Sequence, residues 1–157
     1  MYYDEFESQF GKIQLQADDE GLTALAFQGG DAPISSHGLT KNPEKFIEVK
    51  KQLIEYFDGK RKAFSLVLSM KGTAFQKDVW QELQKIPFGK SCSYGDIASK
   101  LNNPKAVRAV GAANGKNPIA VIVPCHRVIG ANKKLTGYAG GLPLKQKLLT
   151  LEGIEFS

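Results

Sequence analysis

The stretch SYGDIASKLNNPKAVRAVGAAN, residues 93–114, decides the fold of this 157-residue chain. Ser93 and Asp96 have the spacing of a capping box, in which the two side chains satisfy free backbone N–H groups at the start of a helix. This predicts a helix that runs to about Leu101. Asn102-Asn103-Pro104 then ends that helix and opens another, which we expect over residues 104–114. Two helices joined by so short a turn are typical of a helix-turn-helix.

A further helix is expected just before this pair. Thr73 and Gln76 form a second capping box, and the helix should stop before Pro87. Its apolar residues recur at helical spacing and predict one buried face; they are Phe75, Val79, Trp80, Leu83 and Ile86.

The last of these helices has a nearly bare surface. Residues 106–113 are alanine, valine and glycine except for Arg108. Small side chains allow a helix to approach a phosphate backbone or a narrow groove closely. The alternative is that the alanines pack against neighbouring helices, and part of the face must do so. Packing does not explain Arg108, the one long cation in the row.

The first seventy residues read as a small sheet with one packed helix. Alternation predicts strands over residues 10–17 and 22–27, and a third strand over 64–68. A polar loop, 29–42, carries His37, which we expect to be an exposed bystander. Asn42-Pro43 should open a helix that ends at Asp58-Gly59. Its expected apolar positions are Phe46, Val49, Leu53, Ile54 and Phe57. The change in character near residue 70 predicts two domains, 1–70 and 71–157.

Composition limits the class of protein. Hydrophobic residues make up 42% and charged residues 24%, which is typical of a globular chain. No apolar run is long enough for a bilayer, so we expect no membrane partner, and the acidic N-terminus lacks an export signal, which favours a cytoplasmic location. The two cysteines, Cys92 and Cys125, and the two histidines show no zinc-type pairing, so no metal is expected.

Charge is distributed unevenly along the chain. Residues 1–70 hold 8 Lys and Arg against 11 Asp and Glu, whereas residues 71–157 hold 13 against 5. A basic half joined to an acidic half favours a face built for a polyanion such as nucleic acid. The alternative is a solvated, lysine-rich surface with no partner.

Cys125 and His126 are the strongest candidates for chemistry. The apolar run 119–123 leads into Pro124, which cannot continue a ladder, so the chain should turn and present Cys125 at the end of a buried segment. A neighbouring histidine favours the thiolate near neutral pH. Adjacent side chains on an extended chain point apart, so we expect a bridging water between them. Glu152 is the candidate that orients the imidazole.

The alternative for Cys125 is a buried, inert thiol, which is the commoner meaning of an isolated Cys-His pair. Cys92 has no such neighbours, and we interpret it as structural.

The sequence around these residues resembles the O6-alkylguanine-DNA alkyltransferases. The resemblance covers residues 73–157 closely and 1–70 only in general plan. The matching segments occur in the family's order and close to its spacing; they are FQKDVW (75–80), IP (86–87), SY (93–94), NPKAVRAVG (103–111), GKNP (115–118), PCHRV (124–128), GYAGG (137–141), LL (148–149) and EG (152–153).

The resemblance implies an α+β fold and a reaction. The N-terminal part would be a ribonuclease H-like antiparallel sheet with a helix, and the C-terminal part a winged helix-turn-helix. The protein would bind double-stranded DNA in the minor groove as a monomer and flip O6-alkylguanine, or O4-alkylthymine, out of the duplex. Cys125 would then accept the alkyl group once, irreversibly and without a cofactor.

Roles for single residues follow from the same resemblance. His126 and Glu152 would form the water-linked base system of Cys125, and Arg108 would fill the gap left by the flipped base. Serine replaces Ala139 in some relatives, so only a backbone role at that position carries over. The remaining implied roles are catalytic or bracing for Tyr94 and Asn117, DNA contact for Tyr94, Ala109, Ala112 and Arg127, and substrate pocket for Trp80, Val128, Tyr138 and Ala139.

Three other functions fit parts of the pattern. Relatives that flag alkylated bases without chemistry have tryptophan where this chain has Cys125. A Cys-His hydrolase leaves the bare helix and Arg108 unexplained. A winged-helix transcription factor has no need of Cys125, His126 and Glu152 together.

Overall fold

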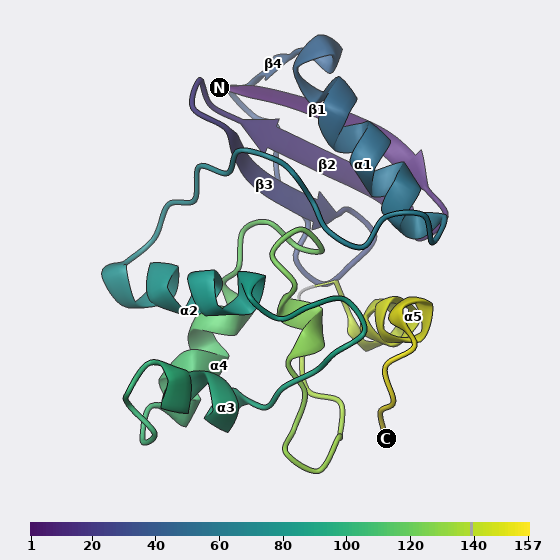
Figure 1. Cartoon of the computed structure of the whole chain (residues 1–157). Coiled ribbons are helices and arrows are strands. Elements are labelled where there is room, and N and C mark those ends of the chain that lie inside the picture. The colour runs from purple at the N-terminus through teal and green to yellow at the C-terminus, as the bar shows by residue number, and fades with distance from the viewer. Residues whose placement is uncertain (139) are drawn as a thin grey trace.

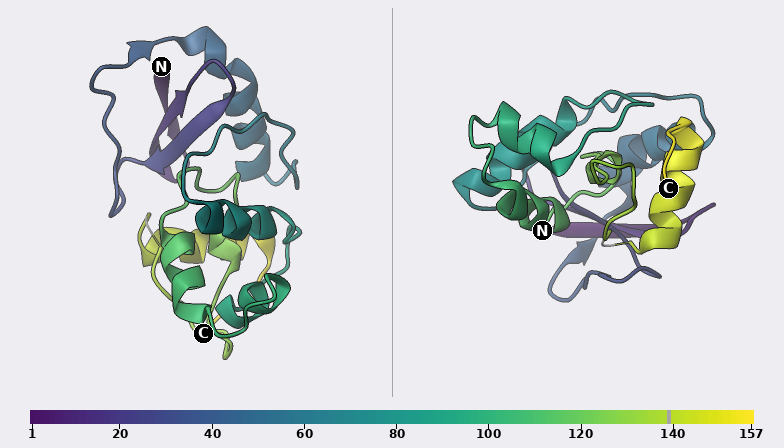
Figure 2. Two further views of the ribbon diagram at one scale, coloured as in Figure 1. Left: turned by 90° about the vertical axis from the view of Figure 1, so that its left-hand side faces the viewer. Right: turned by 90° about the horizontal axis from the view of Figure 1, so that it is seen from below.

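A computed structural model describes residues 1–138 and 140–157. Figure 1 shows a sheet crossed by one helix, with the remaining helices gathered below it, and Figure 2 shows these two parts stacked end to end. The α+β class and the helix-turn-helix are therefore confirmed. No helix within the described ranges is both long enough and apolar enough to cross a membrane.

The sheet has the strand order β3-β2-β1-β4. Strands β1 (Tyr2–Ser8), β2 (Gly11–Ala17) and β3 (Leu22–Phe27) form an antiparallel meander, and β4 (Thr40–Lys41) pairs in parallel with β1. Neither β1 nor β4 was predicted. The charged residues of β1 concealed its alternation, and β4 lies in the expected loop because two residues carry no periodic signal.

Helix α1 (Ile47–Phe57) covers one face of the sheet after a 3-10 turn at Pro43–Phe46 (Figure 1). Phe46, Val49 and Leu53 are buried as predicted, but Ile54 is 49% exposed, and Tyr56 is fully buried instead. The helix is rotated slightly relative to the predicted apolar face, which brings the Tyr56 ring into the core.

The predicted strand at 64–68 is wrong. The segment is extended, but it pairs with the sheet only at a single bridge between Leu22 and Leu68. The backbone bonds there are Leu22 N to Val67 O, 3.0 Å, and Ser69 N to Leu22 O, 2.7 Å. Alternating residues predicted a strand, but no ladder forms. Residues 118–120 occupy the edge of β3 at Leu25, so the segment 64–68 pairs only beside Leu22.

The C-terminal part contains α2 (Ala74–Gln84), α3 (Tyr94–Lys100), α4 (Val107–Gly115) and α5 (Leu142–Glu152). Both predicted capping boxes are present, at Thr73 with Gln76 and at Ser93 with Asp96. Helix α4 starts three residues later than predicted, because residues 104–106 form a turn.

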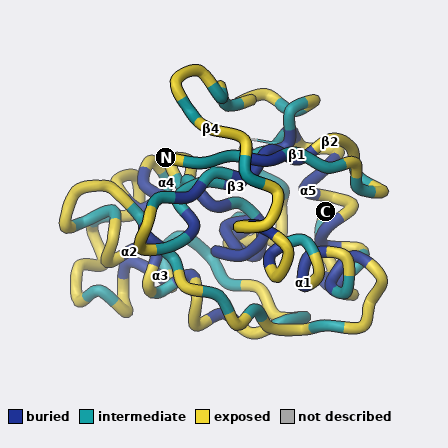
Figure 3. The backbone as a smooth tube through the Cα atoms, turned by 90° about the horizontal axis from the view of Figure 1, so that it is seen from above, coloured by how far each residue is buried: buried dark blue, intermediate teal, exposed yellow. Residues whose placement is uncertain are grey.

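The edge strand β3 joins the two parts of the molecule. Leu25 donates from its backbone N to the carbonyl of Pro118 at 2.9 Å, and its carbonyl accepts from Ala120 N at 3.2 Å. The segment that leads to Cys125 is thus docked on the sheet, and one hydrophobic core runs through both parts. Figure 3 shows buried backbone toward the middle of the molecule and exposed backbone in the loops around it.

Candidate active site

A turn braced by Asn117 presents Cys125. The Asn117 side chain donates from Nδ2 to the carbonyl of Val123 at 2.8 Å and accepts from Ile119 N at 3.1 Å. Within the turn, Val121 has a φ of 69°, which is costly for a β-branched residue and shows that its surroundings hold it there. The chain therefore turns before Pro124, and Cys125 begins a short 3-10 helix that ends at Arg127.

The thiol of Cys125 lies in a buried and polar surrounding. The residue is 6% exposed, and burial raises the pKa of its thiol. The hydrogen bond of Asn117 and the positive charge of Lys145 act in the opposite direction. A thiol with a raised pKa needs a base to remove its proton.

His126, the next residue along the chain, lies against a buried carboxylate. Its Nε2 lies 2.7 Å from Oε2 of Glu152, and both side chains are fully buried. Burial lowers the pKa of the imidazole, so the neutral ring is favoured. A carboxylate only accepts hydrogen bonds, so Nε2 carries the proton and Nδ1 keeps its lone pair. Nδ1 is buried and has no hydrogen-bond partner among the residues the structure describes.

Glu152 gathers four groups onto one carboxylate. Besides His126, it accepts from Arg127 Nε at 2.8 Å and Nη2 at 3.1 Å, from the hydroxyl of Tyr56 at 2.5 Å, and from Gly89 N at 3.1 Å. Burial alone would raise its pKa, but the hydrogen bond and charge interaction with His126, followed by the hydrogen bonds from Arg127 and Tyr56, lower it to about 2. The carboxylate stays ionised and can stabilise a positively charged imidazole.

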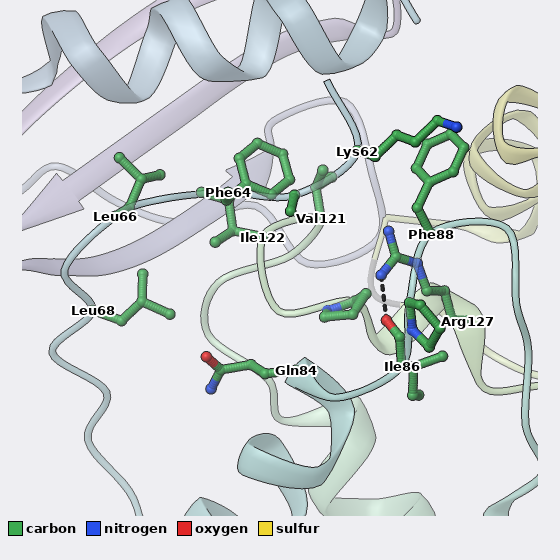
Figure 4. Close-up of a pocket in the computed structure, with 13 residues that line it drawn as sticks. Lys62, Phe64, Leu66, Leu68, Gln84, Ile86, Phe88, Val121, Ile122 and Arg127 are labelled. Atoms are coloured by element: carbon green, nitrogen blue, oxygen red, sulfur yellow. Dashed lines mark hydrogen bonds between the residues drawn. The ribbon is translucent and has the colours of Figure 1, made fainter. Parts of the chain in front are cut away.

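Arg127 does not lie on a surface that DNA can reach, so the expected contact is corrected. Its guanidinium donates from Nε and Nη2 to the Glu152 carboxylate. The remaining nitrogen, Nη1, donates to the carbonyl of Ile86 at 2.6 Å (Figure 4). A buried carboxylate requires a paired cation, and Arg127 supplies it. Arg127 also lines the cavity of about 420 Å³ drawn in Figure 4, whereas Cys125 does not.

Two of the expected pocket residues belong to the core instead. Trp80 is 1% exposed, and its Nε1 donates to the carbonyl of Ala113 at 2.9 Å, which ties α2 to α4. The Val128 side chain is fully buried, while its backbone forms a bridge with Cys92. Large apolar residues near a predicted site are difficult to divide between core and pocket from sequence alone.

Hydrogen bonds join three polar side chains, Tyr94, Thr136 and Lys145, and the first and last of these interact with the charge of Cys125. The hydroxyls of Tyr94 and Thr136 are hydrogen-bonded to each other. Lys145 is fully buried, and its Nζ donates to the carbonyl of Val128 at 2.8 Å; burial lowers its pKa to about 8. Sequence reasoning missed Lys145 and Thr136, because a lysine in an amphipathic helix normally predicts a solvated position.

Tyr138 contributes a buried ring to the same region. It is 9% exposed, and its hydroxyl has no hydrogen-bond partner within the described part of the chain. Burial, and secondly the charge of Cys125, raises its pKa well above the ordinary value. Ala139, the other expected pocket residue in this segment, lies outside the described residues.

Helix α4 has two faces. Val110 and Ala113 are buried, whereas Arg108, Ala109 and Ala112 are exposed. The packing interpretation of its small residues therefore holds for the buried face, and close approach to DNA stays a prediction for the exposed one. Over residues 1–138 and 140–157, the Arg108 side chain makes no hydrogen bond or ion pair. In the same ranges no cluster of three or more His, Cys, Asp or Glu could hold a metal ion.

The chain is similar to known proteins over its whole length. Residues 1–70 match the ribonuclease-like domain of 6-O-methylguanine DNA methyltransferase, and residues 74–154 match the DNA binding domain of the same family. The methylated-DNA–protein-cysteine methyltransferase of Methanosarcina acetivorans is 53% identical over 98% of this chain and 99% of its own. The constitutive protein of that name from Bacillus subtilis is 45% identical over 99% and 97%.

A solved structure extends this similarity to three dimensions. The crystal structure of Mycobacterium tuberculosis OGT in complex with DNA matches with a TM-score of 0.92 and 44% identity, covering 98% of this chain and 93% of that one.

Proposed function

The chain belongs to the methylated-DNA–protein-cysteine methyltransferases, and on that premise we propose that it repairs DNA by moving an alkyl group from O6 of a damaged guanine to Sγ of Cys125. The observation that carries the proposal is a buried Cys125 followed directly by His126, whose imidazole is paired with the buried carboxylate of Glu152. The exposed small side chains of α4, in the same basic half of the chain, support DNA as the partner.

The reaction begins with removal of the thiol proton. The proton passes through a water molecule to Nδ1 of His126, and Glu152 stabilises the resulting imidazolium. The thiolate is a soft, strong nucleophile, and it attacks the alkyl carbon. The bond from that carbon to O6 breaks, the electron pair stays on guanine, and guanine takes up one proton. We place the base against Tyr94 and Tyr138, both of which interact with the charge of Cys125.

The damaged base must leave the duplex before this step. O6 of guanine points into the major groove of a stacked pair, whereas Cys125 is buried in the protein. Flipping costs a few kcal/mol, and less for a damaged pair. We place α4 in the minor groove, with Ala109 and Ala112 against the backbone and Arg108 in the space that the base vacates.

The transfer happens once per molecule. A thioether carbon is not exchanged as a disulfide is, so the alkylated Cys125 is a final product. O4-alkylthymine presents a comparable alkyl oxygen beside a ring nitrogen, and we include it as a substrate. The protein would act as a monomer, without a cofactor, on DNA in the cytoplasm, with residues 71–157 carrying the chemistry and 1–70 supporting them.

The test measures repair and binding separately. Duplex DNA that contains one O6-methylguanine is incubated with the native protein, with Cys125→Ser and with Cys92→Ser, and the loss of the modified base is followed. We expect full repair by the native protein and by Cys92→Ser, and none by Cys125→Ser, which still binds the duplex nearly as well. Repair by Cys125→Ser would contradict the proposal.

A further inference from the structure

The turn after β3 packs its backbone directly against the segment that precedes α5 (Figure 1). Gly30 donates from N to the carbonyl of Phe27 at 3.1 Å, so it lies in a tight turn at the end of the strand. A Cβ added at Gly30 would lie 2.7 Å from Cα of Gly140 and 2.8 Å from its carbonyl oxygen. Carbon atoms do not approach backbone atoms so closely, so only glycine fits unless one segment moves.

The β3 side of this contact is held in place. The Gln28 side chain donates from Nε2 to the carbonyl of Ile34 at 2.8 Å and accepts from Ile34 N at 3.0 Å. The Gln28 backbone N donates to the carbonyl of Lys12 in β2 at 2.8 Å. The loop around Gly30 is thus closed on itself and anchored to the sheet.

The other side of Gly140 faces the active site. A Cβ added at Gly140 would lie 2.6 Å from Cδ2 of Leu144 and 2.8 Å from Cε2 of Tyr138. Gly140 is therefore confined between Gly30 on one side and the Tyr138 ring on the other. A displacement of Gly140 away from Gly30 therefore meets the side chains of Leu144 and Tyr138.

Tyr138 links this stack to the reaction. Its ring is buried close enough to Cys125 for the thiolate charge to act on it, and its buried hydroxyl has no partner within residues 1–138 and 140–157. An unsatisfied buried hydroxyl is costly, so it is suited to accept or donate a hydrogen bond to a bound molecule.

We propose that Gly30 is a positioning residue for alkyl transfer: through Gly140 it sets where the Tyr138 ring lies, and so where the alkylated base is held against Cys125. This inference rests on the proposed function. It assigns part of the substrate geometry to the N-terminal part of the chain, although Gly30 itself contributes no chemical group to the site. A reacting pair displaced by about 1 Å loses roughly 100-fold in rate, so a small shift is measurable.

The test compares Gly30→Ala with Gly29→Ala. Gly29 and Gly30 line one cavity of about 280 Å³. A Cβ at Gly29 meets nothing within 4 Å, and the backbone of Gly29 is not left-handed. Each variant is assayed for single-turnover transfer from the free base O6-methylguanine and for alkylation of Cys125 by iodoacetamide. The iodoacetamide reaction needs the thiolate but not the base pocket.

We expect Gly30→Ala to slow transfer roughly 10- to 100-fold, while iodoacetamide reacts within about twofold of the native rate. Gly29→Ala should match the native protein in both reactions. Equal transfer by the two alanine variants would overturn the inference. So would a parallel loss of iodoacetamide reactivity, because the contact would then support the whole site and not the base pocket.

A second variant covers the case in which Gly30→Ala does not fold. Gln28→Ala loosens the same loop without adding an atom against Gly140, and it should slow transfer several-fold with unchanged iodoacetamide reactivity. Native transfer by Gln28→Ala would overturn the inference. A native protein that transfers no methyl group at all would instead refute the proposed function.

Discussion

At the level of residues, a single carboxylate connects the side chains of the proposed site. Glu152 orients His126, neutralises Arg127 and accepts from Tyr56, so catalytic and structural demands meet on one group. Arg127 is the reason that the arrangement is stable, because a buried carboxylate without a cation would become protonated. An ionised Glu152 in turn fixes the tautomer of His126 that leaves Nδ1 free to accept a proton.

The pH dependence of transfer follows from the base. Burial lowers the pKa of His126 below its ordinary 6.5, so the imidazole remains neutral and able to accept a proton as the pH falls through that value. We predict that the single-turnover rate does not fall by half until the pH is below 6.5. Rates measured from acidic to neutral pH test this, and a midpoint above 6.5 would show that the neutral ring is not the base.

Removal of the Tyr56 hydroxyl should destabilise the protein. Tyr56→Phe leaves Glu152 with one donor fewer inside the core, which costs about 1–3 kcal/mol. Urea unfolding measures this cost. Tyr2→Phe is the matched control, since its hydroxyl bonds to Asp19 on the surface and should contribute little. If the two variants lost the same free energy of unfolding, the buried Tyr56 hydrogen bond would contribute no more than the surface bond of Tyr2.

At the level of secondary-structure elements, helix α4 has small side chains on both of its faces. One face packs on α2, where Trp80 fixes the distance between the helices, and the other is bare apart from Arg108. The capping boxes at Thr73 and Ser93 could be predicted because their partners lie three residues away in sequence. The strands β1 and β4 could not, because their pairing depends on distant segments.

Arg108 should act on the duplex and not on the chemistry. Arg108→Ala should slow repair of duplex DNA strongly at saturating DNA but barely affect the free base O6-methylguanine, which needs no flipping. Arg108→Lys should restore only part of the duplex rate, because an ammonium cannot stack as a plane.

Lys105→Ala is the control for Arg108, since it removes a nearby exposed charge and should weaken binding without lowering the saturating rate. A near-normal saturating rate for Arg108→Ala would mean that Arg108 only anchors a phosphate.

At the level of the whole molecule, an acidic part that contains the sheet is stacked end to end with a basic helical part. The edge of β3 docks the segment that leads to Cys125, and Gly30 contacts the segment that leads into α5. Cys125 stays a prediction, and it rests on the whole ordered set of matching segments, because the Cys-His pair alone left an inert thiol as the commoner meaning and the charge asymmetry alone left a solvated surface open. The buried cations Arg127 and Lys145 were misassigned or missed, because sequence shows a charge but not whether a buried acceptor lies opposite it.

DNA binding should depend strongly on salt and weakly on sequence. Residues 71–157 carry 13 Lys and Arg, of which Arg127 and Lys145 are buried, and the exposed face of α4 has few side chains long enough to read bases. We expect affinity for undamaged duplex to fall roughly 100-fold or more between about 50 mM and about 200 mM salt. A salt-independent affinity, or a marked preference for one undamaged sequence, would contradict this.

The location and number of transferred methyl groups test the central claim most directly. Trypsin releases Cys125 in the peptide 117–127 and Cys92 in the peptide 91–100, so mass spectrometry separates the two thiols. After reaction with excess DNA containing O6-methylguanine, we predict one added methylene mass on 117–127, none on 91–100, and never more than one per molecule. A methyl group on 91–100, or repair of the DNA with 117–127 unmodified, would contradict the account.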